Sequence, residues 1–200
     1  MGKVFCIGFQ KTGTTSMEAA LVKLGYSVCG VRHDLIEAVR TKDLQTIRNV
    51  VDQFDAVQDN PWPVLYRELD QLFPGSKFIL TIREEQVWYE SVLNHFNSTP
   101  SPMQELIYGF SYPADHKAAY LKTYLQHISD VNLYFENRSS DFLIIDITQD
   151  PTWNRLCSFL DKPIPHTPFP HFNKGAYTLY GKIWKYLWKR IRARWRRLFS

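Results

Sequence analysis

Short apolar runs alternate along this chain with segments whose apolar residues recur at the three- and four-residue spacing of helices. Runs of the length and composition of strands cover residues 3–9, 26–29, 55–58, 77–82 and 142–147. Helical patterns cover residues 15–24, 34–39, 44–54, 64–73, 86–96, 114–135 and 153–160. This alternation predicts an α/β fold of three layers, α/β/α, in which helices cover both faces of a central parallel sheet.

Residues 8–15 (GFQKTGTT) join the first predicted strand to the first predicted helix. They keep the glycine spacing of the phosphate loop GxxxxGK[ST], but Thr14 stands where that loop has lysine, and Lys11 carries the charge instead. The N–H groups at the helix start, with Lys11 and the hydroxyls of Thr14, Thr15 and Ser16, would form an anion site. The simpler interpretation is a Gly-Thr turn that only starts a helix.

A second candidate site follows the predicted strand at residues 77–82. Arg83 ends this strand, at the edge of the sheet where ligands of parallel α/β folds bind, and Ser91 follows eight residues later in the next helix. A guanidinium group matches phosphate oxygens in a bidentate way, so this pair could hold a second phosphate. The alternative is that Arg83 pairs with Glu84 or Glu85 and that Ser91 is an ordinary helix-surface residue.

Together the two motifs resemble those of the sulfotransferases that use 3′-phosphoadenosine 5′-phosphosulfate (PAPS). Residues 10–15 nearly reproduce that family's [PGR]-K-[ST]-G-T-[ST] loop, and Arg83 with Ser91 is similar to its 3′-phosphate site. The resemblance covers residues 3–97 well and the rest weakly, and it implies a P-loop, nucleotide-kinase-like sulfotransferase fold. It also implies that the following residues contact PAPS, the sulfuryl donor: Gln10, Lys11, Thr12, Gly13, Thr14, Thr15, Ser16, Arg83 and Ser91. Lys174 and Gly175 loosely match the family's R-K-G element, in which Asn173 replaces the arginine.

The resemblance implies in-line transfer of a sulfuryl group from PAPS, which leaves adenosine 3′,5′-bisphosphate and needs no metal. Lys11 would stabilise charge on the bridging oxygen as it leaves. A general base must accept the proton of the acceptor, and the first candidate is Asp59, after the strand-like run at residues 55–58; the second is His33. Asp59 could instead cap a helix before Pro61. The remaining histidines are expected on the surface or in loops: His95, His116, His127, His166 and His171.

The resemblance implies an acceptor that carries a hydroxyl or an amine: a carbohydrate, a lipid or a small molecule. Residues 97–113 are rich in proline, serine and aromatic residues, and we expect them to form a loop that acts as a lid or acceptor wall.

Composition agrees with a single enzyme domain, which we place at residues 1–178. The chain has 200 residues, of which 44% are hydrophobic, and its three cysteines are an odd number without metal-ligand spacing. They are expected to be reduced core residues of a cytoplasmic protein.

The last segment, residues 179–200, predicts a basic amphipathic helix. It contains eight Lys or Arg and no acidic residue, so the rest of the chain carries a net negative charge although the whole carries +4. Its apolar residues recur at helical spacing: Trp184, Leu187, Trp188, Ile191, Trp195 and Leu198. This pattern suits an anionic membrane surface, whereas nucleic-acid binding is not expected. The alternative is a terminal helix that packs on the body.

Two other functions remain open from the sequence. A magnesium-dependent phosphotransferase of the nucleotide-kinase type would share the fold, but it would normally keep lysine after Gly13. A non-catalytic nucleotide-binding module would use the same pocket while its basic helix recruits it to membranes.

Overall fold

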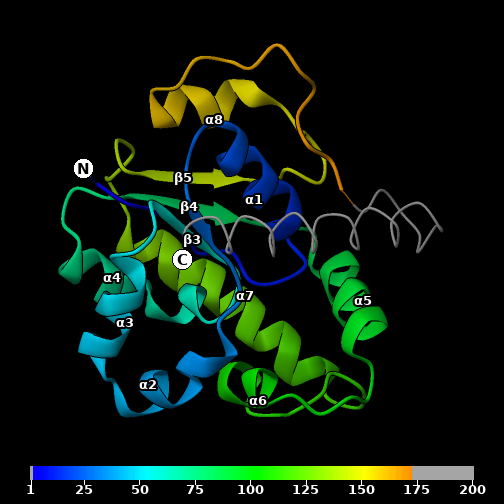
Figure 1. The fold of residues 1–200 in the computed structure, drawn as a ribbon. Coiled ribbons are helices and arrows are strands. Elements are labelled where there is room, and N and C mark those ends of the chain that lie inside the picture. Colours follow the sequence, from blue (N-terminus) through cyan, green and yellow to red (C-terminus); the bar gives the residue numbers. More distant parts are fainter. Residues whose placement is uncertain (1, 173–200) are drawn as a thin grey trace, which may run out of the picture. The chain divides into compact units, whose positions relative to one another are not determined.

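Five parallel strands form one sheet in the computed structural model, which describes residues 2–172. The strands are β1 (Val4–Cys6), β2 (Val28–Cys29), β3 (Ala56–Gln58), β4 (Lys77–Thr81) and β5 (Phe142–Ile145). They lie in the order β2-β3-β1-β4-β5, so β1 is central and Val4 pairs with both Ala56 and Lys77. All four pairings between neighbouring strands are parallel, which confirms the predicted parallel sheet; Figure 1 labels β3, β4 and β5 within it.

Within the described residues, seven helices follow the predicted segments with shifts at their ends, and an eighth lies at residues 102–108, where no helix was predicted. They are α1 (Thr14–Lys23), α2 (Ile36–Thr41), α3 (Leu44–Val51), α4 (Tyr66–Leu72), α5 (Glu85–Phe96), α6 (Pro102–Tyr108), α7 (Lys117–Tyr134) and α8 (Trp153–Leu160). Two short 3-10 turns, His33–Leu35 and Trp62–Leu65, precede α2 and α4.

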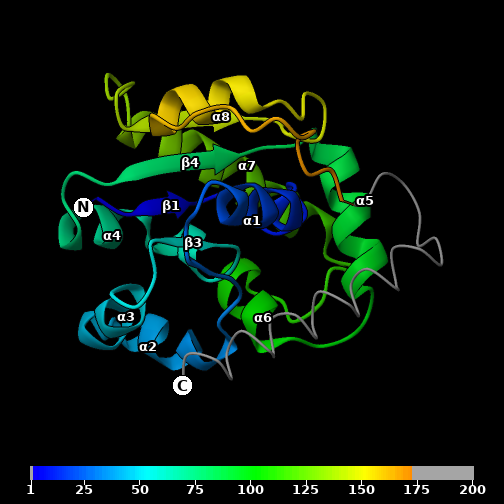
Figure 2. The same ribbon diagram turned by 45° about the horizontal axis from the view of Figure 1, so that its top comes forward.

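The two faces of the sheet bury separate cores because successive strand residues point to opposite sides. Phe5 and Ile7 pack in one core with residues of α3, α4 and α7, whereas Val4 and Cys6 pack in another with α1 and α8. Figures 1 and 2 show these helices on the two sides of the sheet. The predicted α/β/α layering is therefore confirmed.

A third cluster, rich in aromatic side chains, joins α5, α6 and α7 beyond the carboxyl end of β1. Trp88 stacks on Tyr124 with ring centroids 4.0 Å apart, and Tyr108 stacks on Tyr120 at 4.1 Å. Helix α6 lies inside the segment at 97–113 that we expected to be a loop throughout, and this expectation was wrong. Proline at the first helical position and Gly109 in a left-handed conformation at the end delimit the helix.

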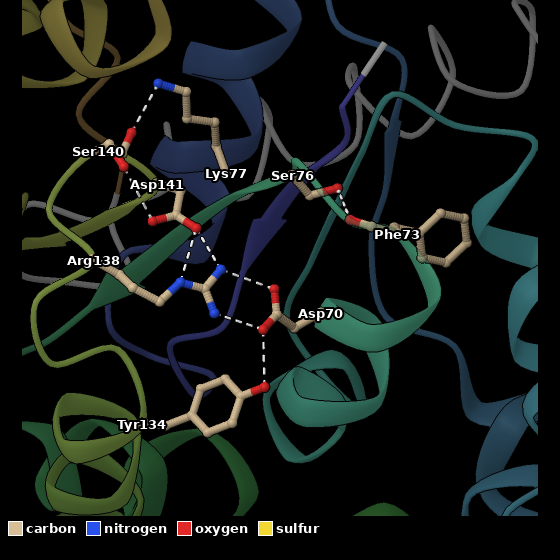
Figure 3. A network of polar contacts seen from close by, with 8 residues as sticks. All are labelled: Asp70, Phe73, Ser76, Lys77, Tyr134, Arg138, Ser140 and Asp141. Carbon is tan, nitrogen blue, oxygen red and sulfur yellow. Dashed lines mark hydrogen bonds and ion pairs between the residues drawn. The ribbon is translucent and has the colours of Figure 1, made fainter.

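An ion-pair network ties helices to the start of β5 (Figure 3). Arg138 donates to both carboxylate oxygens of Asp70 in α4, at 2.6 and 3.0 Å, and also binds Asp141 through Nε at 3.0 Å. Tyr134, near the end of α7, donates to Asp70 at 2.8 Å. Nearby, the ammonium of Lys77 donates to the carbonyl of Ser140 at 3.0 Å. These contacts fix the chain between α7 and β5 at the amino end of the sheet.

Residues through Pro170 form one compact unit, and a second unit begins at His171. The predicted boundary after residue 178 and the predicted basic helix lie outside the described residues. All three cysteines are buried thiols and none is in a disulfide: Cys6, Cys29 and Cys157. No helix within residues 2–172 combines the length and apolarity needed to cross a membrane.

Candidate functional site

Close packing fixes the two glycines that frame the loop between β1 and α1. A Cβ at Gly8 would lie 2.0 Å from Oγ1 of Thr81 in β4, so a side chain cannot fit. Gly13 has a φ of 97°, and a Cβ there would lie 2.7 Å from Cγ1 of Ile147. Both positions therefore require glycine for the loop to pass the sheet and start the helix.

Lys11 lies in this loop with a left-handed backbone, at φ 69°, and its side chain is half-buried. The following turn is held by Thr12, which is fully buried. The Thr12 hydroxyl donates to the carbonyl of Phe9 at 2.6 Å and lies 2.6 Å from Oγ1 of Thr81. Thr12 therefore shapes the loop through its side chain and leaves Lys11 at the rim.

The start of α1 presents the N–H groups that the sequence led us to expect. The carbonyl of Gly13 accepts from the N–H groups of Ser16 and Met17, at 2.9 and 3.0 Å. The N–H groups of Thr14 and Thr15 come earlier in the first turn, where a helix offers no internal acceptor. Thr15 is exposed, whereas Thr14 and Ser16 are buried. This helix end is thus an electropositive site beside Lys11.

Asp59 follows β3 directly and has a left-handed backbone with a φ of 67°. Its Oδ1 accepts from the backbone N–H of Asn60 at 2.8 Å. Burial raises the pKa of Asp59, and a hydrogen bond from the side chain of Thr14 is the main opposing influence. The charges of Lys11 and His33 also favour the ionised carboxylate. The structure therefore brings Asp59 to the phosphate loop, within electrostatic reach of Lys11.

His33 begins the turn before α2 and is exposed. It follows Arg32, which is hydrogen-bonded to the residue after Asp59, so both candidate bases lie at the same end of the sheet. The neighbouring Arg32 pairs with Asp34 through Nε at 2.8 Å, and its backbone N–H donates to the carbonyl of Asn60 at 3.0 Å. This backbone contact ties the segment of His33 to the segment of Asp59.

Arg83 leaves β4 beside the loop. The hydroxyl of Tyr124 accepts from the backbone N–H of Arg83 at 2.8 Å and donates to its carbonyl at 2.7 Å. The guanidinium Nη1 donates to the carbonyl of Lys11 at 3.3 Å, while Nε is buried without a hydrogen-bond partner in the described chain. Within residues 2–172 Arg83 forms no ion pair, and Glu84 instead caps α5. The alternative interpretation, in which Arg83 pairs with Glu84 or Glu85, is therefore not supported within the described residues.

Ser91 lies on α5 and is half-buried. In the described part of the chain no hydrogen bond joins Ser91 to Arg83. Gln10, which was also predicted to contact PAPS, is 4% exposed, and its side chain is hydrogen-bonded to Asn60 and Tyr108. Lys174 and Gly175 lie outside the described residues.

Several residues of this region escaped the sequence analysis. Tyr124, which fixes the backbone of Arg83, and Thr81, which holds Thr12, are distant in sequence from the loop. His127 is buried in α7, where its Nε2 lies 2.7 Å from the carbonyl of Ile7, so the expectation of a surface or loop histidine was wrong. The sequence did contain a signal of this burial, because His127 shares the helical spacing of one buried stripe with Tyr120, Tyr124 and Val131.

A family model described as a sulfotransferase domain matches residues 3–113 and 95–178. The curated Ava biosynthesis cluster protein M of Aspergillus versicolor is 22% identical over 208 residues, which cover 84% of this chain and 80% of that protein. A gluconokinase structure from Sinorhizobium meliloti 1021 shares 18% identity with a TM-score of 0.36, covering 68% of this chain and 97% of that one. That last likeness is too low to carry an argument.

Proposed function

Because the chain belongs to the sulfotransferase domain family, we propose that it transfers a sulfuryl group from PAPS to a hydroxyl or amine of an acceptor. One observation carries the proposal. Lys11, the start of α1 and Asp59 meet at the carboxyl end of the parallel sheet, and the guanidinium of Arg83 reaches the same loop.

The chain's own groups fit a donor with two anionic ends. The N–H groups of Thr14 and Thr15 and the ammonium of Lys11 offer donors to a 5′-phosphosulfate. The buried Nε of Arg83 lacks a partner in the described chain, and an unsatisfied buried donor is costly unless a ligand engages it. PAPS, when bound, supplies an electrophilic sulfur and a bisphosphate leaving group.

In this proposal Asp59 is the general base. As a carboxylate it can accept the proton of an acceptor hydroxyl or amine. The Thr14 side chain and the backbone N–H of Asn60 hold its oxygens, while Lys11 favours its charged form. His33 is the second candidate base, because it lies near Asp59 and is exposed to an incoming acceptor. Lys11 stabilises negative charge that develops on the leaving oxygen.

Titration calorimetry with adenosine 3′,5′-bisphosphate tests the donor site. We expect binding without added metal and in the presence of EDTA, weakened by roughly 10- to 100-fold in Lys11→Ala. Lys23→Ala is the matched control, because Lys23 is exposed at the far end of α1. Failure of the wild-type protein to bind at low salt would overturn the proposal, and a requirement for magnesium would favour a phosphotransferase.

Turnover of radiolabelled PAPS against a panel of hydroxyl and amine acceptors tests catalysis. Asp59→Asn should abolish transfer while it leaves binding of the bisphosphate intact, and His33→Ala should retain transfer. The opposite pattern would make His33 the base. Binding without turnover of any acceptor would favour a non-catalytic module.

Recruitment to an anionic membrane through residues 180–200 is a separate part of the proposal. It rests on the eight Lys or Arg residues and the apolar spacing of this segment, which lies outside the described residues.

A further inference from the structure

Gln10 lies inside the protein although it belongs to the phosphate loop. The resemblance made it a donor contact, yet only 4% of the residue is exposed. Its Nε2 donates to the hydroxyl of Tyr108 at 2.7 Å and lies 3.5 Å from Oε1 of Gln104, both in α6. Its Oε1 accepts from Nδ2 of Asn60 at 2.7 Å. Both ends of the amide are therefore engaged by protein groups.

The backbone of Gln10 adds a third connection. Its carbonyl accepts from the indole Nε1 of Trp88 at 2.9 Å, and Trp88 belongs to α5, which also carries Ser91. One residue therefore touches α5, α6 and the segment after β3, three elements far apart in sequence.

The contact with Asn60 matters most, because Asn60 is bonded to one candidate base, Asp59, and to the residue that precedes the other, His33. Its backbone N–H donates to Oδ1 of Asp59 at 2.8 Å. Its carbonyl accepts from the N–H of Arg32, the residue before His33, at 3.0 Å. A shift of Asn60 would thus move Asp59 relative to the loop that carries Lys11.

We infer that Gln10 is a positioning residue and does not bind PAPS. Through its side-chain amide it holds the segment of Asp59 and helix α6 in place against the phosphate loop. The roles of the connected elements rest on the proposed function. The connection itself does not, because each hydrogen bond joins groups of the protein alone.

Hydrogen exchange of the ligand-free protein tests this connection. Gln10→Met keeps the side-chain volume but removes both polar ends, so packing is largely retained. We expect amide protection in 59–62 and in α6 to fall by roughly tenfold, as for loss of buried hydrogen bonds. Protection in α8, which packs on the other face of the sheet, should stay unchanged. Tyr108→Phe should lower protection in α6 alone.

Gln10→Glu provides the rescue. A neutral carboxylic acid offers one donor and one acceptor, as the amide does, so protection in 59–62 and α6 should return toward the wild-type value as pH falls. A residue that only fills space would be replaced equally well by Met and would show no such rescue. Unchanged protection in Gln10→Met at both segments would overturn the inference.

Affinity for adenosine 3′,5′-bisphosphate separates this inference from the proposed function. Gln10→Met should change the affinity less than about threefold, far less than Lys11→Ala. A loss as large as that of Lys11→Ala, with unchanged exchange, would make Gln10 a donor contact and contradict its positioning role. If the wild-type protein does not bind the bisphosphate, the proposed function fails, and the exchange measurements still decide the role of Gln10.

Discussion

The guanidinium Nη1 of Arg83 donates to the backbone carbonyl of Lys11 across 3.3 Å, so the end of β4 supports the residue that would face the sulfuryl group. This contact gives Arg83 two possible roles. It could bind a 3′-phosphate, as the resemblance implies, or it could hold the loop.

Arg83→Met separates these roles when two ligands are compared by calorimetry. If Arg83 binds the 3′-phosphate, the affinity for adenosine 3′,5′-bisphosphate should fall by roughly tenfold or more, because a charge-assisted hydrogen bond is lost. The affinity for adenosine 5′-phosphate, which lacks the 3′-phosphate, should change little. Arg67→Met, on the exposed side of α4, serves as the control. Equal losses for both ligands would mean that Arg83 acts through the carbonyl of Lys11.

The raised pKa of Asp59 predicts a pH dependence of both activity and stability. Burial favours the neutral acid, so transfer by the wild-type protein should increase with pH as the carboxylate forms. The folded state binds the proton more tightly than the unfolded state does. Stability is therefore lost as pH rises from the ordinary carboxyl pKa through the raised one. Thermal unfolding at neutral pH should show Asp59→Asn to be more stable than wild type; lower stability would contradict this explanation.

The buried His127 predicts that stability changes with pH in the opposite direction to the change expected for Asp59, and in the acidic range. Burial lowers its pKa to about 4, and its neutral Nε2–H donates to the carbonyl of Ile7. Because the folded state disfavours the charged imidazole, stability should fall as pH drops from the ordinary value near 6.5 toward 4, by about 3 kcal/mol. Urea unfolding between pH 7 and 4 measures this loss. His127→Phe keeps the ring stack on Phe9 and should flatten the pH dependence; an unchanged slope would assign it to other groups.

The ion-pair network around Arg138 lies away from the candidate site and predicts a loss of unfolding free energy when it is broken. Arg138→Met leaves the largely buried Asp70 carboxylate without its bidentate partner, which should cost about 1–3 kcal/mol of unfolding free energy. Arg48→Met removes an exposed pair with Asp52 on one helix and should cost less than about 0.5 kcal/mol. Urea titration of both variants provides the comparison. Similar losses would show that the network adds nothing beyond a surface pair.

The basic segment at the end of the chain predicts binding to anionic vesicles. Full-length protein should float with vesicles that contain phosphatidylserine, and a chain that ends at Ala176 should not. Added salt should weaken flotation, since the attraction between Lys or Arg and headgroups is screened. Equal flotation of the two chains would remove the membrane proposal.

Much of the fold could be predicted because the apolar pattern is strong in the central strands. The apolar pattern predicts buried strands at residues 77–82 and in the first strand, and both lie in the middle of the sheet. Helix α6 was missed because its segment is rich in serine and proline, which are typical of loops. Pro102 at the first helical position and Gly109 after the last turn were the available signals.

The candidate site could be predicted where its residues belong to one contiguous motif. Lys11 and the helix start come from a single loop, and parallel topology brings Asp59 and Arg83 to the same edge of the sheet. The role of Gln10 could not be predicted, because its partner Tyr108 is 98 residues away and only packing brings the two side chains together. Thr12 and Thr81 are likewise joined by tertiary structure alone.

Lys11 and Asp59 share one backbone property, since both adopt left-handed conformations that cost a residue with a side chain about 1–2 kcal/mol. Glycine would meet the backbone requirement at either position at lower energy. Under the proposed function, Lys11→Gly and Asp59→Gly would relieve this backbone cost and at the same time remove the side chains that the transfer requires.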